Sequence, residues 1–259
     1  MENLWQRLST NASCFSALRK KRFDCVIQAS RSTPRDHRLF GRLLGAQRYL
    51  TRAFDPTNGH EIVRTLSILN GVGLNVAPTP PCVFPDPEGV ARARALLKCG
   101  PVRPALTAIH LSGRTPERQW PLENYLNFIK WGVRQGGRFV VLWSPGDRQQ
   151  PGHPGDDERA ARLREELTGL PVTFFPTETI SHLISALRAC SNLIACDGGQ
   201  CHLAAALQLP VLGLYCRDKV EDWRPWGNMH RIVSAVTVPQ ITVESVCQAF
   251  LTLPQAPGS

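Results

Sequence analysis

The sequence has no long hydrophobic run. None of its apolar stretches reaches the roughly 18 residues that a membrane-spanning helix needs, and no signal-peptide core follows Met1. We therefore expect a cytoplasmic protein. Its hydrophobic share of 42% and charged share of 20% are those of an ordinary globular chain. A length of 259 residues is enough for one large domain or two small ones.

Cysteine is present nine times, but never in the C-x-x-C spacing that is typical of a zinc or redox site. Without a secretory signal, these cysteines are expected to be free thiols in a reducing compartment. Cys196 and Cys216 fall in predicted buried strands, where a thiol acts as a small hydrophobic side chain. The sequence therefore predicts no metal site.

Several catalytic motifs are also missing. The chain has no G-x-S-x-G, no P-loop and no H-E-x-x-H, and no G-x-G-x-x-G follows a predicted strand. Carboxylate pairs suited to hydrolysis cannot be identified either. These absences argue against an α/β-hydrolase, a P-loop nucleotidase, a zinc protease and a standard dinucleotide-binding domain.

Positive charge is in excess, with a net charge of +9, which points to anionic partners. Basic residues form a run only at Arg19-Lys20-Lys21-Arg22. This run is interpreted either as a solvated helix end or as a contact with an acidic membrane surface. No signature of a DNA- or RNA-binding module is present, so we expect no nucleic-acid partner.

The N-terminal third, residues 1–78, shows an incomplete α/β alternation. We predict helices over the first twenty residues, 33–44 and 59–70, with short strands at 23–28 and 47–51. An open α/β domain normally begins with a strand and a glycine-rich turn, and neither is found here. Residues 79–104 are rich in proline and are expected to be a connector with one helix at 87–98.

Residues 105–259 have a clearer pattern. We predict five strands, which alternate with helices, at 106–111, 138–143, 172–175, 193–196 and 211–215. The last helix is expected at 243–253. This order predicts a parallel, doubly wound sheet, in which ligands bind beyond the carboxyl ends of the strands.

The turn after the fourth of these strands is the first candidate site. Gly198 and Gly199 allow a sharp turn, and the helix that follows offers unpaired N–H groups to a phosphate. Asp197 is interpreted either as a helix cap or as an acceptor for a sugar hydroxyl. His202, one turn into the helix, is either structural or a contact to phosphate or ribose.

Two further loops carry candidates. Ser112, Gly113, Arg114 and Arg118 follow the first strand of this region, and arginine is suited to bidentate contact with a diphosphate. Glu158 lies in an acidic helix start, where a carboxylate usually serves only to stabilise the helix.

These residues together resemble a known family. A hydrophobic strand followed by Asp-x-Gly-x-x-His-Leu-Ala-Ala-Ala, together with His110–Arg114, Arg118–Pro121 and Glu158–Ala160, is similar to the heptosyltransferases of lipopolysaccharide core synthesis, glycosyltransferase family 9. The resemblance covers roughly residues 105–250 and extends more weakly to 23–28 and 60–64.

The resemblance implies a GT-B architecture of two Rossmann-like domains, the N-terminal one incomplete and facing the acceptor. It implies inverting transfer of heptose from a nucleotide-sugar, ADP-heptose in the best-known members, to a lipid A–core acceptor, with no metal or other cofactor. A peripheral contact with the inner membrane is consistent with that acceptor. Carried over, Ser112, Gly113 and Arg118 would line the diphosphate and sugar, with Asp197, Gly198, Gly199 and His202 opposite, and Glu158 would face the donor.

Two departures from the family pattern bear on activity. Gly198 stands where the family usually has Thr or Ser, so a hydroxyl donor to phosphate is lost. The opening strand and Gly-Asp loop, which supply the presumed general base, have no counterpart before the first predicted helix, so no catalytic residue can be named. An active enzyme and a binding paralogue without the base both remain open, as does a transferase for another nucleotide-sugar.

Overall fold

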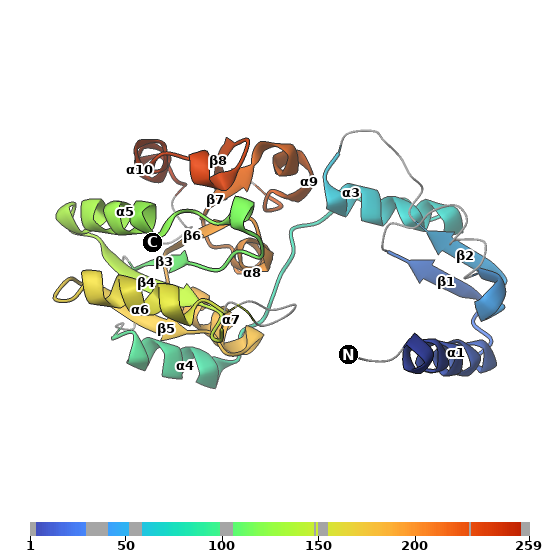
Figure 1. The fold of residues 1–259 in the computed structure, drawn as a ribbon. Coiled ribbons are helices and arrows are strands. Elements are labelled where there is room, and N and C mark those ends of the chain that lie inside the picture. The colour runs from blue at the N-terminus through green and yellow to red at the C-terminus, as the bar shows by residue number, and fades with distance from the viewer. Residues whose placement is uncertain are drawn as a thin grey trace. The chain divides into compact units, whose positions relative to one another are not determined.

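The structure of the protein is a computed structural model that describes residues 4–29, 41–51, 59–98, 106–147, 149, 155–227 and 229–254. The chain divides into two compact units, Met1–Thr79 and Pro80–Ser259 (Figure 1). In the described part of the chain, no helix has both the length and the apolar character needed to cross a membrane.

The first unit contains a short parallel sheet. Strands β1 (Cys25–Gln28) and β2 (Arg48–Thr51) pair in parallel, with Cys25 opposite Arg48. Helix α1 (Leu4–Lys20) precedes them, and α3 (Glu61–Leu66) continues into a 3₁₀ helix at Ser67–Val72. These elements confirm the predicted ones, apart from the helix at 33–44, of which residues 33–40 lie outside the described residues.

The second unit is built on one six-stranded sheet in which all strands are parallel. Its order is β5-β4-β3-β6-β7-β8. The strands are β3 (Leu106–His110), β4 (Arg138–Trp143), β5 (Val172–Pro176), β6 (Asn192–Cys196), β7 (Val211–Cys216) and β8 (His230–Ala235). The chain runs outward from β3 to one edge and then returns to β6, so the switch point lies between β3 and β6.

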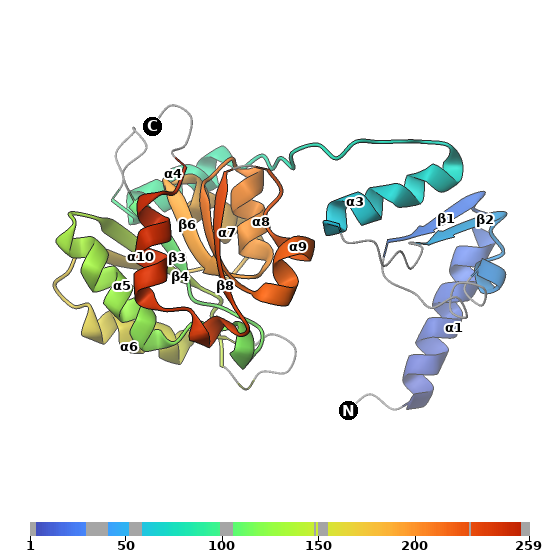
Figure 2. The ribbon, with the colours of Figure 1, turned by 90° about the horizontal axis from the view of Figure 1, so that it is seen from above.

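Helices cover both faces of this sheet (Figure 2). They are α4 (Pro87–Leu96), α5 (Leu122–Arg134), α6 (Asp157–Glu166), α7 (Ile180–Arg188), α8 (Gly199–Ala206), α9 (Val220–Trp223) and α10 (Val243–Leu251). Side chains from α5, α6 and α10 share one core cluster with the sheet, whereas α7 and α8 share the other.

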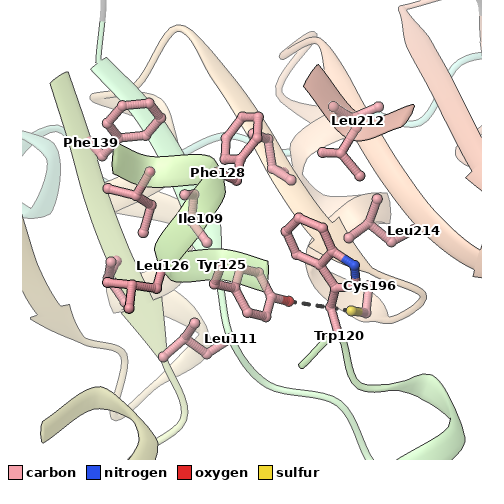
Figure 3. Packing of buried hydrophobic residues seen from close by; sticks show 14 of the residues in the cluster. Ile109, Leu111, Trp120, Tyr125, Leu126, Phe128, Phe139, Cys196, Leu212 and Leu214 are labelled. Carbon is pink, nitrogen blue, oxygen red and sulfur yellow. Dashed lines mark hydrogen bonds between the residues drawn. The ribbon is translucent and has the colours of Figure 1, made fainter. Parts of the chain in front are cut away.

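The two clusters use alternate residues of the same strands, because successive side chains of a strand point to opposite faces. Ile109 and Val141 lie in one cluster, and Ala108 and Val140 lie in the other. Figure 3 shows the first cluster, in which the Phe128 ring of α5 packs edge-on against Phe139. Cys196 and Cys216 are both buried in it, as predicted from their strands.

The prediction of five strands was wrong by one. Strand β8 pairs along β7, with Val211 opposite His230 and Cys216 opposite Ala235. Its sequence has only the apolar pair Ile232-Val233 between His230-Arg231 and Ser234, so it lacks the longer apolar run that marked the predicted strands. The short helix α9 was not predicted either.

The proline-rich segment before β3 is attached to the second unit. Helix α4 begins after Asp86, whose carboxylate accepts from the Gly89 N–H at 2.8 Å, and it packs against α7. The Val83 N–H donates to the Ala206 carbonyl at 3.3 Å. Leu97 is fully buried in the core cluster that includes α7 and α8.

Candidate functional site

A pocket of about 820 Å³ lies beyond the carboxyl ends of β3 and β6, at the switch point of the sheet. Eight of the nine candidate residues line it: Ser112, Gly113, Arg114, Arg118, Asp197, Gly198, Gly199 and His202. The parallel pairing of β3 with β6, with His110 opposite Ala195, brings the loops after these two strands together. Ser112 and Asp197, which are 85 positions apart in sequence, therefore line the same pocket.

Glu158 is the exception. Its side chain is exposed on α6 and lines two other surface hollows, one with Asp147 and Gly155 and one with Gln119 and Pro239. The structure therefore does not bring Glu158 to the pocket that the other eight residues share.

The N-terminus of α8 opens onto the pocket. Gly198 precedes the helix in an extended conformation (φ 173°, ψ 175°), and no side chain caps its first turn. Because no side chain caps this turn, its N–H groups and the helix dipole favour an anion at this point. A Cβ on Gly198 would lie 2.5 Å from the Gln200 amide oxygen, and Gln200 is held by its bond to the Cys196 carbonyl at 2.9 Å.

Asp197 turns away from the helix and toward the other loop. Its carboxylate lies 3.5 Å from the Arg118 guanidinium, and only 9% of its side chain is exposed. Burial raises the pKa of Asp197, and the opposing attraction of Arg118 and Lys219 is smaller. Of the two interpretations of Asp197, capping of α8 thus has no support in the geometry.

The loop after β3 is compact because Gly113 lies against the far end of the same loop. A Cβ on Gly113 would come within 2.8 Å of the Arg118 carbonyl. The Gln119 amide donates to the Gly113 carbonyl, and the Ser144 N–H donates to Ser112 Oγ at 3.0 Å. Ser112 Oγ is thus an acceptor in this bond, and because the residue lines the pocket its hydroxyl is available as a donor to a ligand.

His110 is a pocket residue that the sequence analysis quoted only as part of a motif. It is buried at the end of β3, and burial lowers its pKa to about 4. The Ser112 N–H donates to Nδ1 at 3.3 Å, so the proton of the neutral ring is assigned to Nε2. A neutral imidazole beside the pocket is therefore a donor that carries no charge near pH 7.

The pocket extends along the sheet edge in both directions. Toward β5 it is lined by Thr177, Glu178 and Ile180, and on the β7 side by Trp223 of α9. Thr177 is fixed by its hydroxyl bond to the Trp143 carbonyl at 2.7 Å. Sequence reasoning missed these residues because nothing in their spacing connects them to the glycine turns.

The arrangement suits an elongated ligand with an anionic centre. The α8 N-terminus, Arg114 and Arg118 provide positive potential in the middle, and apolar side chains such as Leu183 and Trp223 lie toward the ends. Within the described residues, no group of His, Cys, Asp and Glu side chains could hold a metal ion.

Solved structures of similar fold include several glycosyltransferases. The chain is similar to E. coli ADP-heptose lps heptosyltransferase II, with a TM-score of 0.71 and 17% identity over 95% of this chain and 81% of that one. It is also similar to the glycosyl transferase family 9 structure from Veillonella parvula, with a TM-score of 0.76 and 15% identity over 97% and 80%. These likenesses confirm the α/β fold with parallel sheets that GT-B heptosyltransferases have.

Curated relatives carry the same family name. Lipopolysaccharide heptosyltransferase 2 of Salmonella typhimurium is 24% identical over 122 residues, which is 47% of this chain and 34% of the relative. The E. coli protein of that name matches to the same extent. The matched segment thus spans about a third of the relatives' length. Residues 42–250 match the model of glycosyltransferase family 9 (heptosyltransferase), and the chain belongs to that family.

Proposed function

We propose that the second unit binds a nucleotide-sugar, with ADP-heptose as the donor, and that the protein transfers the heptose with inversion to a lipopolysaccharide core acceptor. One observation carries this proposal: the loops after β3 and β6 bring an arginine and a helix N-terminus without a side-chain cap into one pocket. The chain's family membership supports the choice of reaction class.

In this proposal the diphosphate lies at the α8 N-terminus. The N–H groups of the first turn and the Arg118 guanidinium balance its charge, and Ser112 donates its hydroxyl hydrogen. During transfer, negative charge builds on the leaving diphosphate, so the same groups stabilise the transition state more than the bound donor. No metal is needed for that role.

A second candidate is a protein that binds the donor without turning it over. Inverting transfer requires a base that accepts the proton of the acceptor hydroxyl. The carboxylates that line the described pocket belong to Glu178 and Asp197. Asp197 is paired with Arg118, and Glu178 is exposed on the β5 side of the phosphate position. Neither is placed as an evident base.

Two measurements with the same protein separate the candidates. Calorimetry with ADP, UDP and GDP tests the donor site, and we expect ADP to bind most tightly. Release of ADP from ADP-heptose in the presence of purified core acceptor then tests transfer. Binding without release leaves the second candidate, and absence of binding by all three nucleotides contradicts both.

We also propose a peripheral contact of the first unit with an anionic membrane. Arg19, Lys20, Lys21 and Arg22 are all exposed at the end of α1. Each basic residue near an anionic surface contributes about 1 kcal/mol of attraction. Co-sedimentation with vesicles that contain phosphatidylglycerol tests this, and equal binding to neutral phosphatidylcholine vesicles contradicts it.

A further inference from the structure

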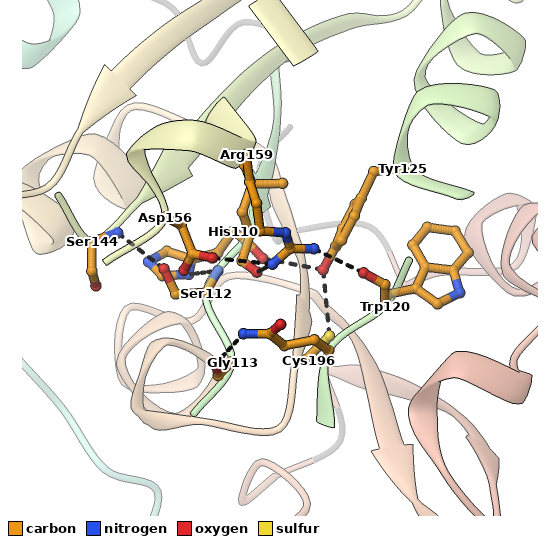
Figure 4. Close-up of polar contacts among 11 residues, drawn as sticks. His110, Ser112, Gly113, Trp120, Tyr125, Ser144, Asp156, Arg159 and Cys196 are labelled. Carbon is orange, nitrogen blue, oxygen red and sulfur yellow. Dashed lines mark hydrogen bonds and ion pairs between the residues drawn. The ribbon is translucent and has the colours of Figure 1, made fainter. Parts of the chain in front are cut away.

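One guanidinium holds both ends of the loop that follows β3. Arg159 Nη1 donates to the Leu111 carbonyl at 3.0 Å, and Nη2 donates to the Trp120 carbonyl at 2.9 Å (Figure 4). These carbonyls bound residues 112–119, the stretch that carries Ser112 and Arg118. The two bonds therefore close this loop at its base, although Arg159 is far away in sequence and comes from α6.

The guanidinium is itself fixed in place. Arg159 Nη1 lies 3.2 Å from an Asp156 carboxylate oxygen. Only 2% of the Asp156 side chain and 13% of the Arg159 side chain are exposed. A buried charge pair of this kind has little freedom, because separating its partners leaves an unpaired charge away from water.

The same guanidinium also lies over the ring of Tyr125, a residue of α5 that contacts the ends of both β3 and β6. The Arg159 guanidinium carbon lies 6.0 Å from the centre of the Tyr125 ring. The Tyr125 hydroxyl is 3.4 Å from the His110 carbonyl and 3.3 Å from Cys196 Sγ. Cys196 directly precedes Asp197, so these contacts join the end of β3 to the end of β6.

Arg159 does not line the pocket. We propose that it is a positioning residue, which holds the loop at 112–119 in the shape that places Ser112 and Arg118 against the diphosphate. This inference rests on the proposed function. Its physical basis is preorganisation: a loop that is already ordered loses less entropy when the ligand binds.

Calorimetric titration of the whole protein with ADP tests the proposal. We expect Arg159→Gln to weaken ADP binding at least tenfold. Arg159→Lys should recover part of the loss, because one ammonium keeps the charge but cannot span both carbonyls. Arg162→Gln is the matched control, since Arg162 is exposed on the same helix, and we expect it to bind ADP as the unchanged protein does.

A double-mutant cycle distinguishes positioning from general damage to the fold. If Arg159 acts through the loop, Arg118→Ala should cost clearly less affinity in the Arg159→Gln background than alone. Additive losses, or unchanged ADP affinity in Arg159→Gln, overturn the proposal. Should Arg159→Gln not fold, Asp156→Asn replaces it in the cycle, because it weakens the hold on the guanidinium and keeps an acceptor in place.

Amide hydrogen exchange without ligand keeps this test separate from that of the proposed function. We expect Arg159→Gln to speed exchange at residues 112–119 and to leave the inner strand β4 unchanged. If the unchanged protein fails to bind ADP, the proposed function fails, while faster exchange in this loop still supports its closure by Arg159. Exchange that is equal in both proteins contradicts that closure.

Discussion

Arg118 and Asp197 form an ion pair across the switch point of the sheet, with 3.5 Å between guanidinium nitrogen and carboxylate oxygen. The pair joins the loop after β3 to the loop after β6. Both side chains line the pocket, and the arginine is the more accessible partner, with 35% of its side chain exposed against 9% for the aspartate. The pair presents a positive group to a ligand.

Arg118→Ala should therefore weaken ADP binding by about 10- to 100-fold, since a hydrogen bond between charged groups contributes about 1.5–3 kcal/mol. Calorimetric titration with ADP measures the change. Arg118→Lys should retain part of the affinity, because the charge remains but the bidentate geometry is lost. Equal affinity for ADP in the alanine variant and the unchanged protein would falsify the role assigned to Arg118.

Asp197→Asn should make the fold less sensitive to pH. Burial raises the pKa of this carboxyl in the folded protein above its value in the unfolded chain. A raised carboxyl pKa means that the folded state binds the proton more readily, so the contribution to stability is full at low pH and is lost as pH rises through the folded pKa.

The matching measurement is urea unfolding of both proteins at pH 4 and pH 7. We expect the asparagine variant to gain stability relative to the unchanged protein on going from pH 4 to pH 7. A change in the opposite direction would show that the attraction of Arg118 outweighs burial.

His110→Gln should show the opposite dependence on pH. Burial lowers the pKa of His110 to about 4, whereas an unfolded histidine titrates near 6.5. The contribution of the neutral ring to stability is complete above the unfolded pKa and is lost as pH falls toward about 4. The full loss is about 3 kcal/mol, because each pKa unit corresponds to about 1.4 kcal/mol.

Unfolding curves at pH 7, 5.5 and 4 measure this effect as the difference between variant and unchanged protein. The other titratable groups are present in both proteins, so their contributions cancel in the difference. Because glutamine does not titrate, the remaining dependence on pH comes from His110. A constant difference across this pH range would contradict a lowered pKa of His110 in the folded protein.

Gly113→Ala should destabilise the protein by about 1–3 kcal/mol, the usual cost of forcing an atom into a packed region. Its Cβ would lie 2.8 Å from the Arg118 carbonyl, which is backbone and cannot rotate away. Gly199→Ala is the matched comparison for stability, because a Cβ there meets nothing within 4 Å. Thermal unfolding of both variants tests the difference, and equal midpoints would refute the close approach at Gly113.

The inner strands could be predicted from the sequence because burial on both faces requires continuous apolar runs, such as the Val140-Val141-Leu142 stretch of β4. Strand β8 could not, because polar residues, His230-Arg231 and Ser234, flank its short apolar pair Ile232-Val233. The other edge strand, β5, keeps the apolar residues Val172, Phe174 and Phe175 and was predicted. The order of the strands in the sheet could not be predicted from the sequence either, since strand pairing depends on contacts between distant segments.

The candidate site likewise contains residues that could be predicted from the sequence and residues that could not. The turn at Asp197–His202 and the loop at Ser112–Arg118 were predictable because glycine before a helix start has a local meaning. Arg159 had no such signal: its carbonyl partners are 39 and 48 residues away. Glu158, chosen by resemblance, lies beside Arg159 on α6 but faces other hollows.

The attachment of α4 sets a practical limit on how this protein can be divided. Leu97 is completely enclosed by the core beneath β3, and Val83 is tied to the end of α8. A recombinant fragment that starts at the first strand of the large sheet would leave a hole where Leu97 sits. A fragment made for studies of the second unit should therefore begin near Pro80, although the first strand of the large sheet starts only at Leu106.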